Sequence, residues 1–95
     1  FKRVDLLVAP VSPMSPFGIG EKTDDPLKMW LADAFTVTIN PAGIPALALP
    51  CGFTRDNLPI GMQLIGPQLS EDNLFRVGYA YQQITNWHKK KPKID

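Results

Sequence analysis

Two apolar segments joined by a short polar turn, at residues 46–53 and 59–66, constrain the fold of this sequence most strongly. The first, ALALPCGF, is apolar at nearly every position, which is typical of a strand covered on both faces. The second alternates, so that Ile60, Met62 and Leu64 face one way and Gly61, Gln63 and Ile65 face the other. Residues 54–58 between them have the length of a hairpin loop. The sequence therefore predicts an antiparallel hairpin, with a bulge or a sheet edge at Pro50, because proline has no N–H for a ladder bond.

Two residues of the second predicted strand carry further expectations. Gly61 has no Cβ and allows another part of the backbone to approach closely. Gln63 needs hydrogen-bond partners if it is buried, so we expect it to hold neighbouring segments together before it serves any site.

The N-terminal part predicts a short strand followed by a long irregular loop. The apolar run from Val4 to Ala9, bounded by Pro10, is typical of a strand buried on both faces. Residues 10–26 contain four prolines and two glycines, which exclude a helix and a central strand. A 17-residue irregular segment is unusual in a compact domain and is often a functional or partner-covering loop.

A helix is predicted to begin at Asp25, which can accept a hydrogen bond from a first-turn N–H, and at Pro26, which suits the first helical position. Apolar residues at helical spacing predict a buried stripe formed by Leu27, Trp30, Leu31 and Ala34. At about 100° per residue, Asp33 falls outside this stripe, so it either looks into a cleft beside the core or is solvated.

The connection to the hairpin and the last helix follow from local signals. Asn40-Pro41 is expected to break the chain, because the residue before a proline avoids helical angles. Ser70 is expected to cap the last helix, and Leu69 to staple to Leu74 across its first turn. An apolar face formed by Leu74, Val77, Tyr81 and Ile84 predicts an amphipathic helix of about five turns that continues to His88.

Composition excludes several classes of function. The net charge of +1 favours neither nucleic acid nor an anionic membrane, and no apolar run approaches the roughly 18–20 residues of a membrane span. One cysteine, Cys51, suits a reducing compartment, and one Cys with one His is too small a ligand set for zinc. No cation adjoins Cys51 in the sequence to stabilise a thiolate, which favours a buried, inert thiol. The basic tail HKKKPKID suits either RNA phosphates or, more commonly, a solvated end.

No complete active site is recognisable from the residues alone. Ser12 and Ser15 lie outside any G-x-S-x-G elbow and have no base nearby in the sequence, so ordinary loop serines are the favoured interpretation. His88 has no carboxylate close in the sequence to orient it as a general base. With 95 residues the chain forms one domain at most, and a strand that starts almost at Phe1 suggests a cut from a longer chain. A processed small protein is the alternative.

The order of short motifs resembles the C-terminal part of the amidase-signature enzymes. That pattern runs, loosely, as D-x-L-x-x-P, a helix followed by D-x-x-T, then N-x-A-G-x-P-A, P-C-G and a G-x-P-x-G-x-Q-L-I-G hairpin. The matching segments here are residues 5–10, 33–36, 40–46, 50–52 and 58–66, with Glu71 opening the last helix. Pro41 departs from the usual leucine and Asn57 from a common glycine, both at turns. The ending Gln82…Trp87-His88-Lys89…Pro92 resembles the glutamine-hydrolysing amidotransferase branch of the family.

The resemblance implies an α/β fold, in which residues 1–95 are the C-terminal segment of an amidase-signature domain that is not complete by itself. The implied order is strand, long loop, helix, hairpin and helix, with a mixed sheet covered by helices. In that family one serine attacks the amide, and a second serine, in a cis peptide, relays protons with a lysine. This chain lacks the Gly/Ser-rich stretch that supplies these serines, so no catalytic residue is assigned here. We expect the two serines and the lysine upstream. The one site residue that the resemblance assigns is Asp33, as the ligand of the α-amino group of glutamine.

The implied function is the release of ammonia from glutamine for the transamidation of Glu-tRNA(Gln) to Gln-tRNA(Gln), in the cytoplasm or an organellar matrix. The implied partners are amidotransferase subunits of the B and C type, with glutamine and, indirectly, Glu-tRNA(Gln). ATP and magnesium are expected on a partner subunit, and neither a cofactor nor a metal is expected on this chain. Two alternatives stay open: a segment of a general amidase acting on another amide, and a non-catalytic module that binds through its proline-rich loop or basic tail.

Overall fold

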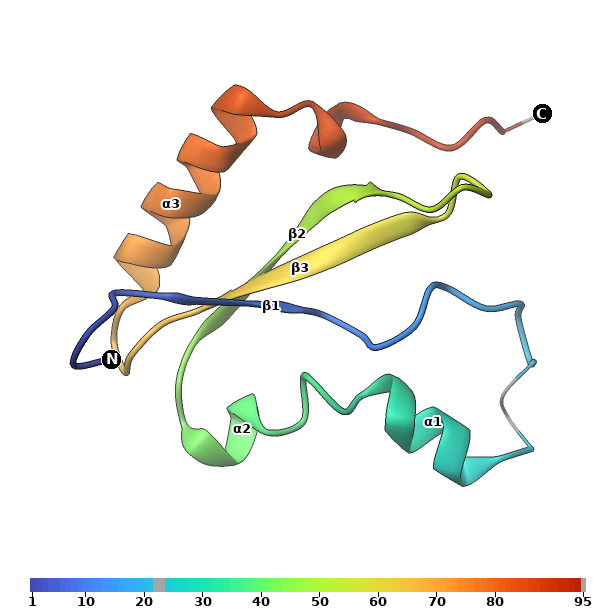
Figure 1. Ribbon diagram of the computed structural model, residues 1–95, viewed down its shortest axis with the longest axis horizontal. Coiled ribbons are helices and arrows are strands. Elements are labelled where there is room, and N and C mark those ends of the chain that lie inside the picture. Colours follow the sequence, from blue (N-terminus) through green and yellow to red (C-terminus); the bar gives the residue numbers. More distant parts are fainter. Residues whose placement is uncertain (22–23, 95) are drawn as a thin grey trace.

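A computed structural model describes residues 1–21 and 24–94 of the chain. Its elements are β1 (Leu7–Pro10), α1 (Pro26–Ala32), α2 (Ile39–Ala42), β2 (Ala46–Phe53), β3 (Pro59–Ile65), α3 (Glu71–Ile84) and a short 3-10 helix, η1 (Trp87–Lys89). The strands form a layer with α3 on one side and with α1 and α2 on the other (Figure 1). The expected α/β class and order of elements are confirmed.

The sheet has the order β1-β3-β2, so β3 is the central strand. Both strand pairs are antiparallel, and a parallel pair, which a mixed sheet needs, is not found among the described strands. The predicted hairpin of β2 and β3 is confirmed, as is the bulge: the register shifts between Pro50 and Gly52. The hairpin loop closes through a 2.8 Å bond from the Thr54 N–H to the Leu58 carbonyl. Asn57 has a left-handed φ of 61°, which explains why glycine suits this position.

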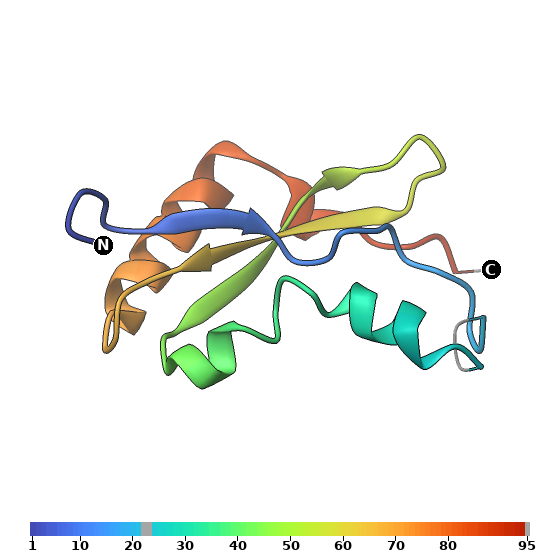
Figure 2. The ribbon, with the colours of Figure 1, turned by 60° about the horizontal axis from the view of Figure 1, so that its bottom comes forward.

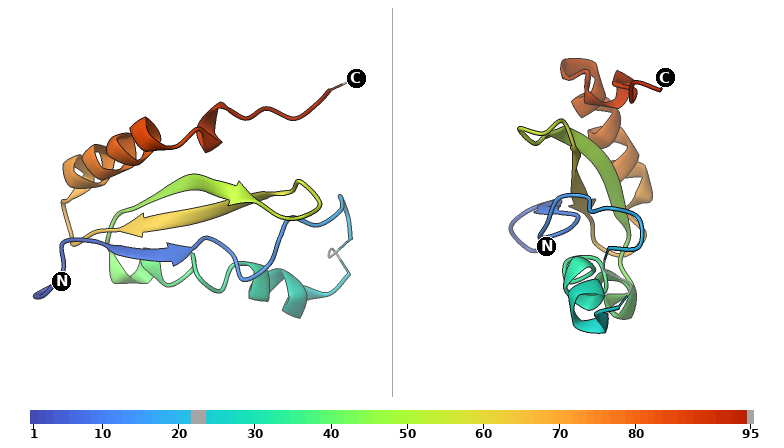
Figure 3. Two further views of the ribbon diagram at one scale, coloured as in Figure 1. Left: turned by 45° about the horizontal axis from the view of Figure 1, so that its top comes forward. Right: turned by 90° about the vertical axis from the view of Figure 1, so that its right-hand side faces the viewer.

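The core lies between α3 and one face of the sheet. It is formed by Leu49, Leu64 and Leu74, with Leu6, Leu47, Met62 and Tyr81 packed around them. Figure 3 shows α3 and α1 on opposite sides of the strands. The prediction that β1 and β2 are buried on both faces is wrong for this chain: Val8 of β1 is 67% exposed, and Ala46 and Ala48 of β2 are exposed. An apolar sequence makes a strand suitable for burial, but burial also requires another element to pack against each face of the strand.

Helix α1 begins where the sequence predicted, but its apolar side chains are not buried as predicted. The Asp25 carboxylate accepts bonds from the N–H groups of Leu27 and Lys28 at 3.1 and 3.3 Å, and Pro26 is the first helical residue. The predicted stripe is not buried: no residue of α1 is buried, and Trp30 is 72% exposed. Helical spacing determines which side chains share a face, whereas burial needs a partner element against that face.

Two further local expectations are corrected at α2 and α3. Asn40 and Pro41 do not break the chain but lie inside the four-residue α2, where a first-turn proline removes an N–H that has no intrahelical partner. Ser70 precedes α3 as expected, yet its hydroxyl donates to the Pro67 carbonyl at 2.6 Å and makes no cap bond. Leu69 is 85% exposed, so the expected staple to Leu74 is wrong.

The end of α3 also differs from the prediction. The helix ends at Ile84, and Thr85 is extended, with φ −131° and ψ 162°. The Thr85 hydroxyl donates to the Tyr81 carbonyl at 2.9 Å and satisfies a group in the last turn. The chain to His88 therefore continues as the separate turn η1 and not as a fifth helical turn.

Candidate functional site

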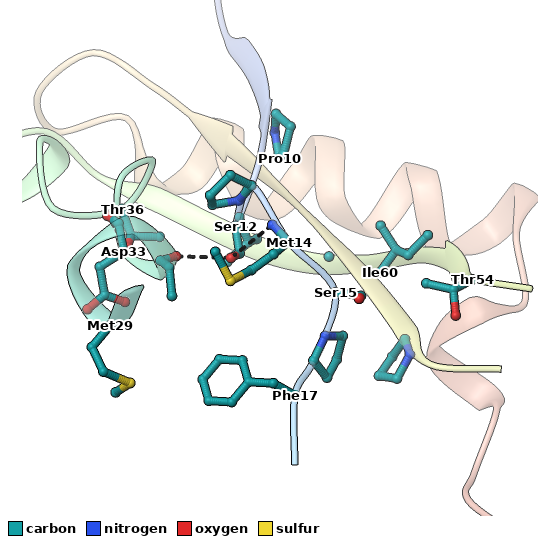
Figure 4. A pocket seen from close by; sticks show the side chains of 16 residues that line it. Pro10, Ser12, Met14, Ser15, Phe17, Met29, Asp33, Thr36, Thr54 and Ile60 are labelled. Atoms are coloured by element: carbon teal, nitrogen blue, oxygen red, sulfur yellow. Dashed lines mark hydrogen bonds between the residues drawn. The ribbon is translucent and has the colours of Figure 1, made fainter. Parts of the chain in front are cut away.

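A pocket of about 550 Å³ lies where the loop after β1 passes the end of α1 and the start of β3. Figure 2 shows the chain leaving β1 and later returning as α1 beneath the strands. In the close view, Met29, Asp33 and Thr36 lie on one side, the segment from Ser12 to Phe17 crosses the middle, and Ile60 and Thr54 lie opposite (Figure 4). Three segments that are distant in the sequence therefore form its walls.

Asp33 ends α1 and lines this pocket. Its backbone carbonyl closes the turn that follows, accepting bonds from the N–H groups of Thr36 and Val37, each at 3.0 Å, and from the Thr36 hydroxyl at 3.1 Å. Its carboxylate is exposed and has no hydrogen bond or ion pair with residues 1–21 or 24–94. From the sequence, Asp33 was expected either to look into a cleft or to be solvated. In the structure both hold, because Asp33 lies at a pocket wall and is open to solvent. Its assignment as a ligand of glutamine stays a prediction.

Hydrogen bonds from two side chains hold the walls of this pocket. The Ser12 hydroxyl donates to the Ala32 carbonyl at 3.0 Å and ties the loop to the end of α1. The Gln63 amide donates to the carbonyls of Pro10, at 3.0 Å, and Phe35, at 2.7 Å. Gln63 is only 3% exposed, so the expectation that it holds neighbouring segments together is confirmed.

Gly61 provides the close approach expected of it. A Cβ added there would lie 3.2 Å from Cγ2 of Val11, and the Val11 N–H donates to the Gly61 carbonyl at 3.2 Å. The loop after β1 therefore lies directly against β3 at one edge of the pocket.

The other candidates from the sequence do not assemble into a catalytic group. Ser12 is engaged in holding the pocket wall, and Ser15 lines the pocket, whose described lining includes neither a histidine nor a lysine. Cys51 is a half-buried free thiol on β2. His88 lies in a separate hollow near the C-terminal end, beside Phe53 and Trp87. Within the described residues, no group of three or more His, Cys, Asp or Glu is arranged to hold a metal ion.

Several lining residues were not singled out from the sequence. Thr36 could have been found from the D-x-x-T spacing, and Met29 from its position one helical turn before Asp33. Thr54 and Ile60 reach the pocket only because the hairpin folds back, which no local pattern shows. The arrangement offers an anionic group beside an apolar hollow, which suits binding of a small cationic or zwitterionic molecule.

Comparison with known proteins places the chain in a family. The sequence profile described as Amidase matches residues 1–75. The chain belongs to the amidase family. This match confirms the resemblance seen in the motifs. Separately, no helix in the described part of this amidase segment is long and apolar enough to cross a membrane.

Its relatives include two proteins that are named as the A subunit of glutamyl-tRNA(Gln) amidotransferase. The one from Rippkaea orientalis is 54% identical over 94 residues, and the one from Nostoc punctiforme is 57% identical over 94 residues. Each alignment covers 99% of this chain but only 20 and 19% of the relatives, so the chain spans about a fifth of their length. The crystal structure of the A subunit of the same amidotransferase from Thermotoga maritima matches with a TM-score of 0.72 and 43% identity, over 79% of this chain and 16% of that one.

Proposed function

We propose that residues 1–95 are the C-terminal segment of the amidase-signature domain of a glutaminase subunit, and that they form one wall of its glutamine pocket. The subunit releases ammonia from glutamine for the transamidation of Glu-tRNA(Gln). The observation that carries this proposal is the Asp33 carboxylate, which lines the pocket and has no partner among residues 1–21 and 24–94, in a chain that is 54% identical to the A subunit of a glutamyl-tRNA(Gln) amidotransferase. The serines and the lysine of the catalytic group belong to another part of the longer protein. Subunits of the B and C type, with ATP and magnesium, act on the tRNA.

The chemistry of glutamine explains the role that we assign to Asp33. Free glutamine carries an α-ammonium group, and a carboxylate accepts a charge-assisted hydrogen bond from it. Such a bond contributes about 1.5–3 kcal/mol, and exposure of Asp33 favours the lower end, which corresponds to roughly tenfold in affinity. The apolar side chains of Met29, Phe17 and Ile60 line the same hollow and suit the methylene groups of the substrate.

The test is the variant Asp33→Asn in the full-length subunit, assembled with its partners. The amide has the same shape as the carboxylate and no charge, so we expect the KM for glutamine to rise about tenfold, with kcat changed less than about threefold. Amidation driven by ammonium chloride instead of glutamine should be unchanged, because it does not use this pocket. Asp72→Asn, in the first turn of α3, is the matched control and should leave the KM unaltered.

Two results would count against the proposal. An unchanged KM for glutamine in Asp33→Asn would show that Asp33 does not bind the α-ammonium group of glutamine. If the unmodified enzyme hydrolyses amides without an α-amino group as efficiently as glutamine, a general amidase is the better description.

A further inference from the structure

We propose that Gln63 is the positioning residue of this pocket: from the centre of the sheet, its amide group holds both walls in place and so determines where Asp33 stands. The inference rests on the proposed function for its link to glutamine. Its geometric part, the positioning of the Asp33 turn, is independent of that function.

The amide group of Gln63 lies at a junction of three segments. Gln63 is on β3, the central strand, and is the one buried polar residue within the described parts of the chain, at 3% exposure. Its Nε2 has two hydrogens and donates to two carbonyls, that of Pro10 at 3.0 Å and that of Phe35 at 2.7 Å. Pro10 ends β1, where the loop on one side of the pocket begins, and Phe35 lies between Asp33 and Thr36, which line the other side. One NH₂ group therefore joins β3 to both walls.

The turn that carries Asp33 has few other attachments to the sheet. Helix α1 has no buried residue, so burial of its side chains does not anchor it. The turn is internally closed by the bonds from Thr36 and Val37 to the Asp33 carbonyl, so it moves as a unit. The Phe35 carbonyl is inside this unit, and among the described residues the bond that it accepts from Gln63 is the hydrogen bond that joins the turn to β3. The Ser12–Ala32 bond ties the end of α1, directly before this turn, to the loop, which Gln63 also holds through Pro10.

Loss of this amide should therefore release the Asp33 turn and the loop together. Gln63→Met keeps the length of the side chain and removes both donors. Gln63→Glu replaces the donating NH₂ group with a carboxylate oxygen, which would face the carbonyl oxygens of Pro10 and Phe35 and repel them. Gln63→Asn keeps the donors on a side chain one methylene shorter, which reaches at most one carbonyl. The expected order of disturbance is therefore Glu, then Met, then Asn.

A matched control is available on the next residue of the same strand. Leu64 is also 3% exposed, and its side chain packs in the core beneath α3, on the opposite face of the sheet from the pocket. Leu64→Val weakens packing on the same strand without touching the bonds to Pro10 or Phe35. A general loss of strand stability should appear in both variants, whereas loss of positioning should appear only in the Gln63 variants.

The experiment compares these variants in the full-length subunit with its partners, by glutamine kinetics and by amide hydrogen exchange read by mass spectrometry. For Gln63→Met we expect a five- to tenfold rise in the KM for glutamine, of about the size caused by Asp33→Asn, and unchanged activity with ammonium chloride. Exchange in peptides covering residues 33–37 and 10–14 should accelerate about tenfold, with little change in α3. The double variant Asp33→Asn with Gln63→Met should show less than the product of the two KM effects, because Gln63 acts through Asp33.

The outcomes separate this inference from the proposed function. If Asp33→Asn raises the KM and Gln63→Met does not, the positioning role is overturned and the glutamine pocket stands. If neither changes the KM but exchange at residues 33–37 accelerates in Gln63→Met alone, the positioning role stands and the glutamine role falls. Equal acceleration in Gln63→Met and Leu64→Val would overturn the positioning role. Gln63→Asn is measured in the same way if Gln63→Met does not fold.

Discussion

Replacement of Gly78 by alanine gives a sharp test of how α3 packs on the sheet. Gly78 is buried in the middle of α3, and a Cβ built there would lie 2.7 Å from Cδ2 of Leu47 and 3.4 Å from Cδ1 of Leu49. Alanine is favoured over glycine inside a helix by about 1 kcal/mol. Overpacking of a well-packed contact costs about 1–3 kcal/mol. With a central cost of about 2 kcal/mol, the net result is a loss of about 1 kcal/mol in the local stability of α3.

Gly78→Ala should have the opposite effect on the stability of α3 when Leu47 is first replaced by alanine. Leu47→Ala removes the methyl group that the new Cβ would meet, so only the gain in helix propensity remains. Gly78→Ala should then stabilise α3 by up to about 1 kcal/mol, which makes the coupling between the two sites about 2 kcal/mol.

Amide hydrogen exchange in the full-length protein measures this local stability directly. A loss of about 1 kcal/mol accelerates exchange of the α3 amides about fivefold, and the same gain slows it about fivefold. Gln83→Ala, on the exposed side of α3, is the control and should change exchange by less than about twofold. If Gly78→Ala has the same effect with and without Leu47→Ala, the argument from close packing is refuted.

Two further substitutions test the core and the hairpin loop. Leu74, only 2% exposed, lies at the centre of the core, so Leu74→Ala should lower the free energy of unfolding by about 2–5 kcal/mol in urea titrations of the full-length protein; a loss below about 1 kcal/mol would contradict the assigned core. Asn57 has a φ of 61°, so Asn57→Ala should cost about 1 kcal/mol and accelerate amide exchange in residues 54–60, while Asn57→Gly should not; similar behaviour of the two variants would argue against a left-handed residue there.

Features set by neighbouring residues could be predicted from the sequence. The hairpin of β2 and β3 was predictable because strand alternation and loop length are local properties. The bulge beside Pro50 and the start of α1 after Asp25 each follow from a single chemical group: a missing backbone N–H in one case and a side-chain carboxylate acceptor in the other. The motif order was also sufficient to indicate the amidase family, because those motifs are contiguous segments of sequence.

Local signals were less reliable where a residue type suits two different local structures. Ser70 has the sequence of a cap, yet its hydroxyl bonds back to Pro67, and Leu69 turns outward with it. Asn40-Pro41 has the sequence of a break, yet proline is tolerated in the first turn of α2. In each case the residue type permits two geometries, and the surrounding chain selects one.

Only the tertiary structure decided which faces are covered and what forms the pocket. The apolar face of α1 is predictable from spacing, but its exposure depends on which elements lie beside it. Asp33 was recognisable as a candidate, whereas the opposite wall at Thr54 and Ile60 required the hairpin to fold back. Gln63 bonds to carbonyls that are 53 and 28 positions away in the sequence. The sequence by itself determined that a buried Gln63 must find partners, because an unpaired buried amide is costly, and the fold alone determined that those partners are the two walls of the pocket.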